Sequence, residues 1–362
     1  MQYSFCGLKQ LKNTNQERPN APRKLRWFRI SLRSTLLLFL LIGGFFGWLG
    51  RELSMINNEA LALAKLPGQA YEQEVYYDFE NTDEVFNTGA PSDQFKPPTP
   101  RWMQAVLGER IFTRVDVLFF NLSAENKSID LTPLTRLRSL GVMGIPSSEF
   151  AGPTQCWNDE LGYSPAPKFS QLSIPPSVQD LHLENFNING IDKLTSLQSL
   201  TVLFCRIDEA NIQDLQFLPA ASTLKMLCFG QSGGVSSLRG IERVENVEDL
   251  SLFGSFKRLD ELQHLKKLVK LDISYSNNIV DLKGFENFTR LTTLTLDGCS
   301  SLNNIEAILA LPNLKEVSLV GCNEIPQAQI DKLKLIATKV KIDATYGDIW
   351  GQEGYRWGHR QN

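Results

Sequence analysis

The stretch LTTLTLDGCSSLNNIEAILALPNL, residues 291–314, decides the fold. Its first, fourth and sixth residues are apolar, and a turn containing Cys299 follows them. Its second half places apolar residues three positions apart, a spacing typical of 3-10 turns rather than of an α-helix. The stretch therefore predicts a short strand joined to a 3-10 segment. Such a coil can bury its apolar edge only against neighbouring copies of itself.

The same pattern recurs along most of the chain. Nine copies carry apolar residues at these strand positions: Val115/Leu118/Phe120, Leu137/Leu140/Val142, Val178/Leu181/Leu183, Leu197/Leu200/Val202, Leu224/Leu227/Phe229, Val247/Leu250/Leu252, Leu268/Leu271/Ile273, Leu291/Leu294/Leu296 and Leu314/Val317/Leu319. A truncated last strand is predicted at Val340 and Ile342. The last five copies begin 23, 21, 23 and 23 residues apart. This regular period predicts an α/β solenoid.

A small residue follows the strand at a fixed distance in six successive copies. These residues are Cys205, Ser232, Ser255, Ser276, Cys299 and Cys322. We expect them to point inward and to satisfy backbone groups of the buried turn. Cys299 and Cys322 belong to adjacent coils, so a disulfide between them is an alternative to two buried thiols.

The pattern resembles the leucine-rich-repeat superfamily over about residues 115–341. The resemblance implies a right-handed horseshoe with parallel strands on the concave face and short 3-10 or α segments on the convex face. The layout is also similar to membrane-anchored leucine-rich-repeat proteins of planctomycete bacteria, through RWFRISLR at 26–33 and VYYDFE at 75–80. That resemblance implies architecture and location, not an activity.

One uncharged apolar segment precedes the repeats. Residues 34–50, STLLLFLLIGGFFGWLG, would span roughly 25 Å as a helix, close to the thickness of a bilayer core. Arg33 and Arg51 flank the segment, and the first 35 residues carry eight basic side chains and one acidic one. The positive-inside rule then predicts a single-pass protein of the cytoplasmic (inner) membrane, with its N-terminus in the cytoplasm and its repeats outside.

A cleaved signal peptide is the alternative interpretation of the apolar segment. Its nearest small-residue cleavage site, at residues 60–64, lies well beyond the apolar run, which favours an uncleaved anchor. Gly43 and Gly47 are four residues apart and form a candidate helix-dimer face. Glycine is also common in membrane helices without any such role.

The predicted organisation has six parts. They are a basic cytoplasmic tail (1–33), a transmembrane helix (34–50), a helical stalk (51–66), an N-terminal cap with strand, loop and short helix (67–114), the solenoid (115–345) and an aromatic tail (346–362). An insertion at about 143–177 is either an excursion from the solenoid or an atypical coil. Longer repeats predict α-helices around 209–218 and 326–339.

The concave face is the candidate binding surface. Its candidate residues are His182, Glu184, Thr201, Leu203, Ser251, Phe253, Asp272, Tyr275, Thr295 and Asp297. Most are polar, and we expect Leu203 and Phe253 to be exposed apolar points, as in many interfaces. Single exposed apolar residues are, however, ordinary on protein surfaces.

The sequence carries no recognisable catalytic or cofactor signature. Its three histidines are far apart, and the chain has no zinc-type pair, no Walker-type glycine loop and no G-x-S-x-G. We therefore expect no enzyme activity, no cofactor, no metal and no nucleic-acid partner. The favoured hypothesis is a membrane-tethered module that binds an unknown protein. A self-associating structural envelope protein, including a homodimer, and a cell-wall carbohydrate binder are the alternatives.

Overall fold

The computed structural model describes residues 32–67, 73–77, 101–107, 113–145, 166–207, 210–230, 235–254, 256 and 258–342. Several sequence-based expectations lie outside these residues. They concern the basic tail before residue 32, most of the loop of the predicted N-terminal cap, the middle of the insertion, the slot residues Ser232 and Ser255, and the aromatic C-terminal tail.

The first described element is one long helix, α1 (Leu32–Leu63). Among the described residues, it is the one helix long and apolar enough to cross a membrane. Its most apolar 18-residue window has a mean hydropathy of 1.7, and no residue of that window is buried. The chain divides into two compact units after Gly50. The first unit holds the apolar half of α1, and the second holds the remaining turns of α1 and the solenoid.

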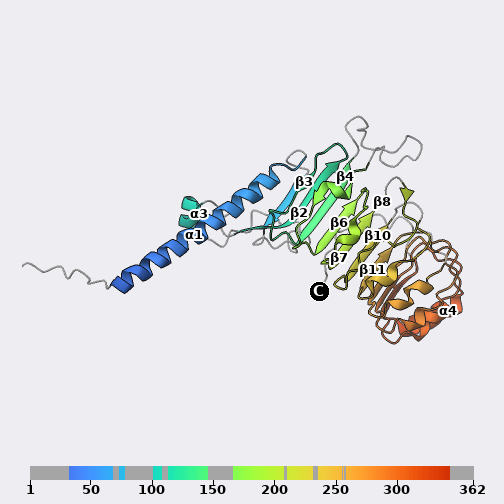
Figure 1. The fold of residues 1–362 in the computed structure, drawn as a ribbon. Helices are drawn as coiled ribbons and strands as arrows, with labels where there is room; N and C mark the ends of the chain where they lie inside the picture. The colour runs from blue at the N-terminus through green and yellow to red at the C-terminus, as the bar shows by residue number, and fades with distance from the viewer. Residues whose placement is uncertain are drawn as a thin grey trace, which may run out of the picture. The chain divides into compact units, whose positions relative to one another are not determined.

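A single curved sheet organises the second unit (Figure 1). The sheet has 11 strands in the order β1-β2-β4-β6-β7-β10-β11-β12-β13-β14-β15, and β1 (Gln73–Tyr77) pairs antiparallel with β2. From β2 onward each strand pairs parallel with the next. These strands are β2 (Val115–Ser123), β4 (Ser139–Ile145), β6 (Asp180–Glu184), β7 (Ser199–Leu203), β10 (Met226–Gly230), β11 (Asp249–Leu252), β12 (Lys270–Asp272), β13 (Thr293–Thr295), β14 (Glu316–Ser318) and β15 (Lys339–Lys341). The predicted solenoid, including its truncated last strand, is confirmed.

The apolar strand positions stack into rows through the core. One row is Leu181, Leu200, Leu227, Leu250, Leu271, Leu294 and Val317, each paired in register with the next and none more than 2% exposed. Each coil therefore buries its leucines against the coils on either side, as the period of the sequence requires. Phe285 and Phe288 fill the wider outer part of the core, with ring centroids 5.1 Å apart.

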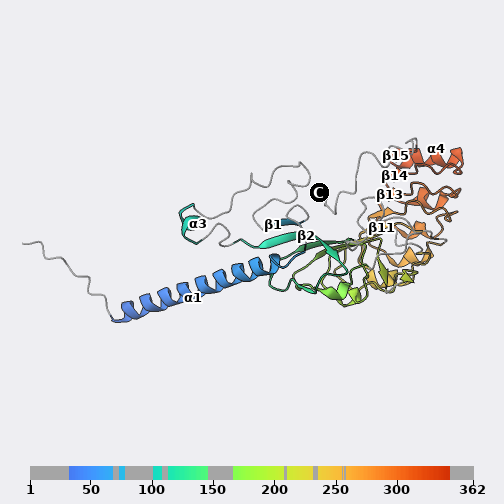
Figure 2. The same ribbon diagram turned by 90° about the horizontal axis from the view of Figure 1, so that it is seen from above.

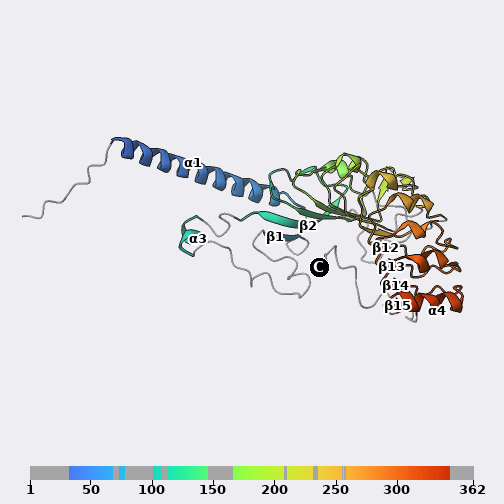
Figure 3. The same cartoon turned by 90° about the horizontal axis from the view of Figure 1, so that it is seen from below.

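The strands face the inside of the curve, and short turns form its outer side (Figure 3). Between the long strands the chain forms 3-10 segments: η3 (Phe169–Gln171), η4 (Ile191–Lys193), η5 (Ile241–Val244), η6 (Asp260–His264), η7 (Phe285–Asn287) and η8 (Glu306–Ala310). A left-handed glycine starts η5 and η7: Gly240 has φ 102° and Gly284 has φ 97°. In each case, the glycine N–H donates to a glutamate two residues later, Glu242 or Glu286, at 2.9 Å. This local bond fixes where the turn begins.

The longer connections differ from one another. β4 pairs directly with β6, so the insertion between them adds no coil to the sheet, which favours the excursion. β5 (Leu172–Ser173), near the end of the insertion, pairs with β3 (Ile129–Asp130), which lies between β2 and β4 in the chain.

One of the two predicted convex helices is wrong. The helix expected around residues 209–218 is replaced by the hairpin of β8 (Arg206–Ile207) and β9 (Ala210–Asn211), followed by turns. Asp214 accepts the N–H of Gln216 at 3.1 Å, a local bond that competes with helix formation. The second predicted helix is present as α4 (Gln327–Ile336), beside β15 (Figure 2).

Candidate binding face

The strand register aligns the predicted concave residues into a row. His182, Thr201, Cys228, Ser251, Asp272, Thr295 and Ser318 pair one after another across seven adjacent strands. All seven are half-buried. The side chains between two core positions of a strand share one face of the sheet, so this row crosses the inner face of the solenoid.

A second row runs beside the first, one position beyond the last core residue. Glu184, Leu203 and Gly230 are in register there, and Phe253 follows in the next coil. The expectation that Leu203 is exposed is wrong, since only 8% of its surface is accessible. The reason is its neighbour: Leu203 Cδ2 lies 3.0 Å from where a Cβ of Gly230 would be, and so does Phe253 Cδ2. Leu203 and half-buried Phe253 thus converge over Gly230 in a small apolar patch.

Carboxylates of neighbouring coils are held by hydroxyl groups of the same face. Ser274 donates to Asp272 at 2.5 Å, and Ser318 donates to Asp297 at 2.7 Å. The backbone N–H of Val320 also donates to Asp297, at 2.9 Å. Burial raises the pKa of Asp272 to about 6, and the charge of Asp297 adds to the effect while the Ser274 bond opposes it. These carboxylates are parts of ordered networks rather than freely rotating surface groups.

The remaining candidates are His182, at one end of the row, and Tyr275, in the coil of β12. His182 Nε2 is 3.8 Å from Glu184 Oε2, but burial lowers the pKa of His182, which favours the neutral imidazole at pH 7. Tyr275 has a left-handed φ of 62°, and its ring lies 2.7 Å from where a Cβ of Gly298 would be. Tyr275 is therefore half-buried on the adjacent coil rather than extended from the face.

The inward-pointing small residues behave as expected. Cys205, Cys299 and Cys322 are each at most 5% exposed, and each thiol lies within hydrogen-bond distance of a carbonyl in the preceding coil. The acceptors are Leu183 (3.5 Å), Ile273 (3.2 Å) and Leu296 (3.0 Å), respectively, and Ser276 donates to the Gly254 carbonyl at 2.5 Å. The described cysteines Cys205, Cys228, Cys299 and Cys322 are not joined in disulfides. Hydrogen bonding with Cys322, together with burial, raises the pKa of Cys299.

A buried ionic cluster, which the sequence did not predict, joins α1 to the first coil. Arg114 immediately precedes β2, and its side chain is 3% exposed. Its Nη2 lies 2.5 Å from Glu52 Oε1, and its Nε lies 3.4 Å from Glu59 Oε1. The two glutamates are seven residues apart and therefore share a face of α1. The seven-residue spacing indicates that the two glutamates share a face of the helix, but it does not indicate that Arg114 is their partner.

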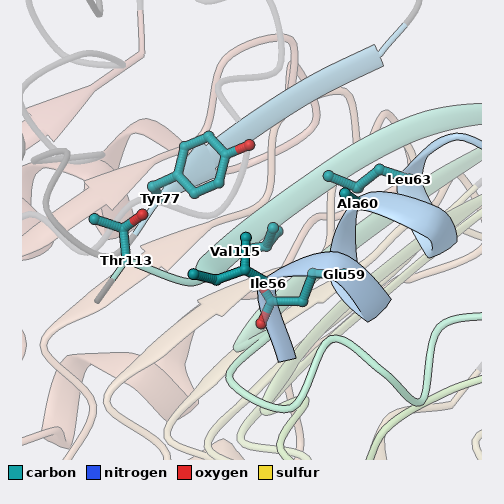
Figure 4. A pocket seen from close by; sticks show the side chains of 7 residues that line it. All are labelled: Ile56, Glu59, Ala60, Leu63, Tyr77, Thr113 and Val115. Carbon is teal, nitrogen blue, oxygen red and sulfur yellow. The ribbon is translucent and has the colours of Figure 1, made fainter. Parts of the chain in front are cut away.

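Apolar packing continues from this cluster along α1. Ala62 and Leu66 belong to the buried core of the solenoid. A shallow recess, partly open to solvent, lies between α1 and the β1–β2 pair (Figure 4). It is lined by Ile56, Glu59, Ala60, Leu63, Tyr77, Thr113 and Val115. The end of α1 is thus part of the solenoid fold rather than a separate stalk.

The other candidate positions give no sign of a chemical site. Within the described residues, no group of three or more His, Cys, Asp or Glu side chains could hold a metal ion. No other part of the chain comes within 4 Å of a Cβ placed on Gly43 or Gly47 in α1. The helix-dimer face therefore stays a prediction.

No family model matches the chain. A probable disease resistance protein of Arabidopsis thaliana is 27% identical over 188 residues, which are 44% of this chain but only 10% of that protein. This chain thus spans about a tenth of that relative's length.

Solved structures similar to the chain are repeat proteins. Internalin C2 of Listeria monocytogenes has 18% identity and a TM-score of 0.36, over 55% of this chain and 80% of that one. A leucine-rich-repeat protein of Leptospira interrogans has 16% identity and a TM-score of 0.33, over 59% and 62%. A complex of TLR13 with ssRNA13 has 20% identity and a TM-score of 0.36, over 67% and 36%.

These comparisons leave the narrower expectations untested. The resemblance to planctomycete proteins stays a prediction. The expectation that no nucleic acid binds also stays a prediction. The fold itself follows from the chain's own geometry: parallel strands in register, a small hydrogen-bonding residue after the strand, and short 3-10 turns on the outer side. The chain has the fold of a leucine-rich-repeat solenoid.

Proposed function

We propose that this chain is a single-pass membrane protein that presents the inner face of its solenoid to a protein ligand outside the cytoplasmic membrane. The observation that carries the proposal is the alignment of polar side chains from seven coils on one continuous face. Repeat proteins use such extended concave surfaces to bind other macromolecules. Half-buried Phe253 adds an apolar point within the polar surroundings, as is common in protein interfaces.

The tether is supported by the composition of α1. Its most apolar window has mean hydropathy 1.7, and none of it is buried in the chain. The basic residues before it and the acidic balance after it favour an orientation with the repeats outside. Membrane attachment would confine the solenoid to a thin layer and raise its effective concentration for a ligand in the same layer.

A matched pair of substitutions tests the inner face. Thr295→Arg places a long charged side chain in the row, next to its last residue Ser318, whereas Thr289→Arg makes the same change at an exposed turn. Each full-length variant is cross-linked in membranes, and captured proteins are identified by mass spectrometry. We expect Thr295→Arg to lose a partner that both the native chain and Thr289→Arg retain.

Three other outcomes have distinct meanings. Equal capture by the two variants would remove the inner face from consideration. Capture of further copies of the chain alone would favour the self-associating envelope protein. Extraction of the full chain from membranes by alkaline carbonate would show that α1 is not an integral anchor, independently of the capture result.

A further inference from the structure

A short helix outside the solenoid exposes an apolar face. Helix α3 (Arg101–Leu107) has the sequence RWMQAVL. Trp102 is 68% exposed and Val106 is 74% exposed. The two residues are four positions apart and therefore lie on one side of the helix. A tryptophan this exposed leaves a large apolar surface in water, at a free-energy cost that a partner surface would remove.

A short linker joins this helix to Arg114, which contacts α1 just after the uncharged segment. Arg114 is seven positions after Leu107, so α3 ends within roughly 25 Å of Arg114. Arg114 is fixed by its ion pairs with Glu52 and Glu59. Glu52 is only two residues beyond Gly50, where the uncharged segment ends. If residues 34–50 span a bilayer, Glu52 and Arg114 lie at the headgroup layer, and α3 is within reach of it.

The composition of α3 fits that layer. Tryptophan is enriched at membrane interfaces because its ring is amphipathic, with an N–H group that stays hydrated. Exposed Arg101 is next to Trp102 and would meet lipid phosphates. A helix with a small apolar face and a basic end lies in the interfacial plane rather than across the bilayer.

We propose that α3 inserts its Trp102 and Val106 side chains into the outer interfacial layer of the bilayer that holds α1. This inference rests on the proposed membrane tether and goes beyond it, since it assigns a second lipid contact. The partner is the phospholipid bilayer. The contact would add to the single attachment at α1 and would keep the first coil close to the membrane surface.

The test places the photoreactive residue p-benzoylphenylalanine at Trp102 in the full-length chain, reconstituted in vesicles of phosphatidylcholine and phosphatidylglycerol. The matched control carries it at Leu335, which is 86% exposed on α4. Because both side chains are exposed, neither replacement removes a core contact. After irradiation, mass spectrometry measures lipid adducts at each position, and we expect a severalfold higher yield at position 102.

The outcomes separate this inference from the tether. If the chain resists alkaline carbonate but position 102 captures no more lipid than position 335, the α3 contact is wrong and the anchor stands. Cross-links from position 102 to another protein or to a second copy, in place of lipid, would also overturn the contact. A chain that carbonate strips from the vesicles would overturn the anchor and the α3 contact together.

Discussion

The first coil and the coils from β11 to β14 are held in different ways. The first coil joins α1 through a buried ionic cluster, in which Arg114 contacts Glu52 and Glu59, beside the apolar packing of Ala62 and Leu66. The later coils hold one another through small contacts that recur in successive coils: a leucine row, a strand pairing and one inward-pointing hydroxyl or thiol. The stabilisation from the ionic cluster depends on three side chains, whereas the stabilisation of the later coils is divided among many small contacts.

This difference follows from what each region must do. A repeat coil meets a neighbour of nearly the same shape, so identical contacts can be reused along the array. The first coil meets β1 at its strand edge and α1 beside its core, and a helix offers no matching leucine row. A buried charge cluster fixes one arrangement of α1 on the coil, because a shifted helix would leave charges buried away from their partners.

The largest effect is expected for Arg114→Met. This change removes the cation that contacts both carboxylates, and it should lower the free energy of unfolding by about 3–5 kcal/mol. Denaturant titration of the full chain in detergent micelles measures the loss. Replacing all three residues with apolar ones, as Arg114→Met with Glu52→Leu and Glu59→Leu, should recover most of it.

Arg138→Met is the matched control for this experiment. Arg138 also pairs with an acidic residue, Asp116, at 3.0 Å, but its side chain is 51% exposed. An exposed pair of this kind contributes below about 1 kcal/mol. Similar losses for the two variants would show that burial of the Arg114 cluster is unimportant and would remove the contrast between the two regions.

A moderate, pH-dependent effect is expected in the regular coils. Burial raises the pKa of Asp272 to about 6, above the unfolded value of 3.8. Below about pH 4 the carboxyl is protonated in both states, and its contribution is fully present. As the pH rises through about 6 the unfolded chain releases the proton more readily, so the free energy of unfolding falls.

The substitution Asp272→Asn isolates this contribution. The variant should be more stable than the native chain at pH 7, by about 1–3 kcal/mol, and should lose that advantage near pH 4. Asp331→Asn, on an exposed part of α4, is the control and should leave the pH profile unchanged. A native profile that is flat between pH 4 and 7 would contradict the raised pKa.

The strands and the inward-pointing small residues were predictable because their signal is local and repeated. Each coil carries its own apolar positions, so Leu271 or Cys299 could be placed from a few neighbouring residues. Leu203 and Tyr275 could not be placed in this way. Their burial depends on Gly230 and Gly298 in the next coil, and a coil-by-coil pattern does not register the size of that neighbour.

The Arg114 cluster escaped prediction for a related reason. It joins residues 62 positions apart, and α1 belongs to no repeat. No period could therefore indicate which residue of the solenoid would meet Glu52 and Glu59. The helix around residues 209–218 was wrong because repeat length alone suggested it, whereas Asp214 forms a local turn that opposes a helix.

The smallest effects, and the sharpest form of the comparison, come from the inward-pointing small residues. Ser276→Ala removes the donor to the Gly254 carbonyl, and Cys205→Ala removes the donor to the Leu183 carbonyl. Each loss should lower the free energy of unfolding by about 1 kcal/mol, with the weaker thiol donor below the hydroxyl. Denaturant titrations of the two single variants and the double variant measure these losses.

Whether the losses of single variants add in the double variant then distinguishes the regular coils from the Arg114 cluster. The two residues belong to coils three strand spacings apart, roughly 14 Å, so their effects should add within about 0.5 kcal/mol. Arg114→Met and Glu59→Gln act on one cluster, and their double variant should lose less than the sum of the single losses, because each removes the same contact. If the coil variants also failed to add, free energy would be shared along the solenoid over several coils. The first coil would then differ from the later ones only in the chemistry of its contacts, not in how far their effects extend.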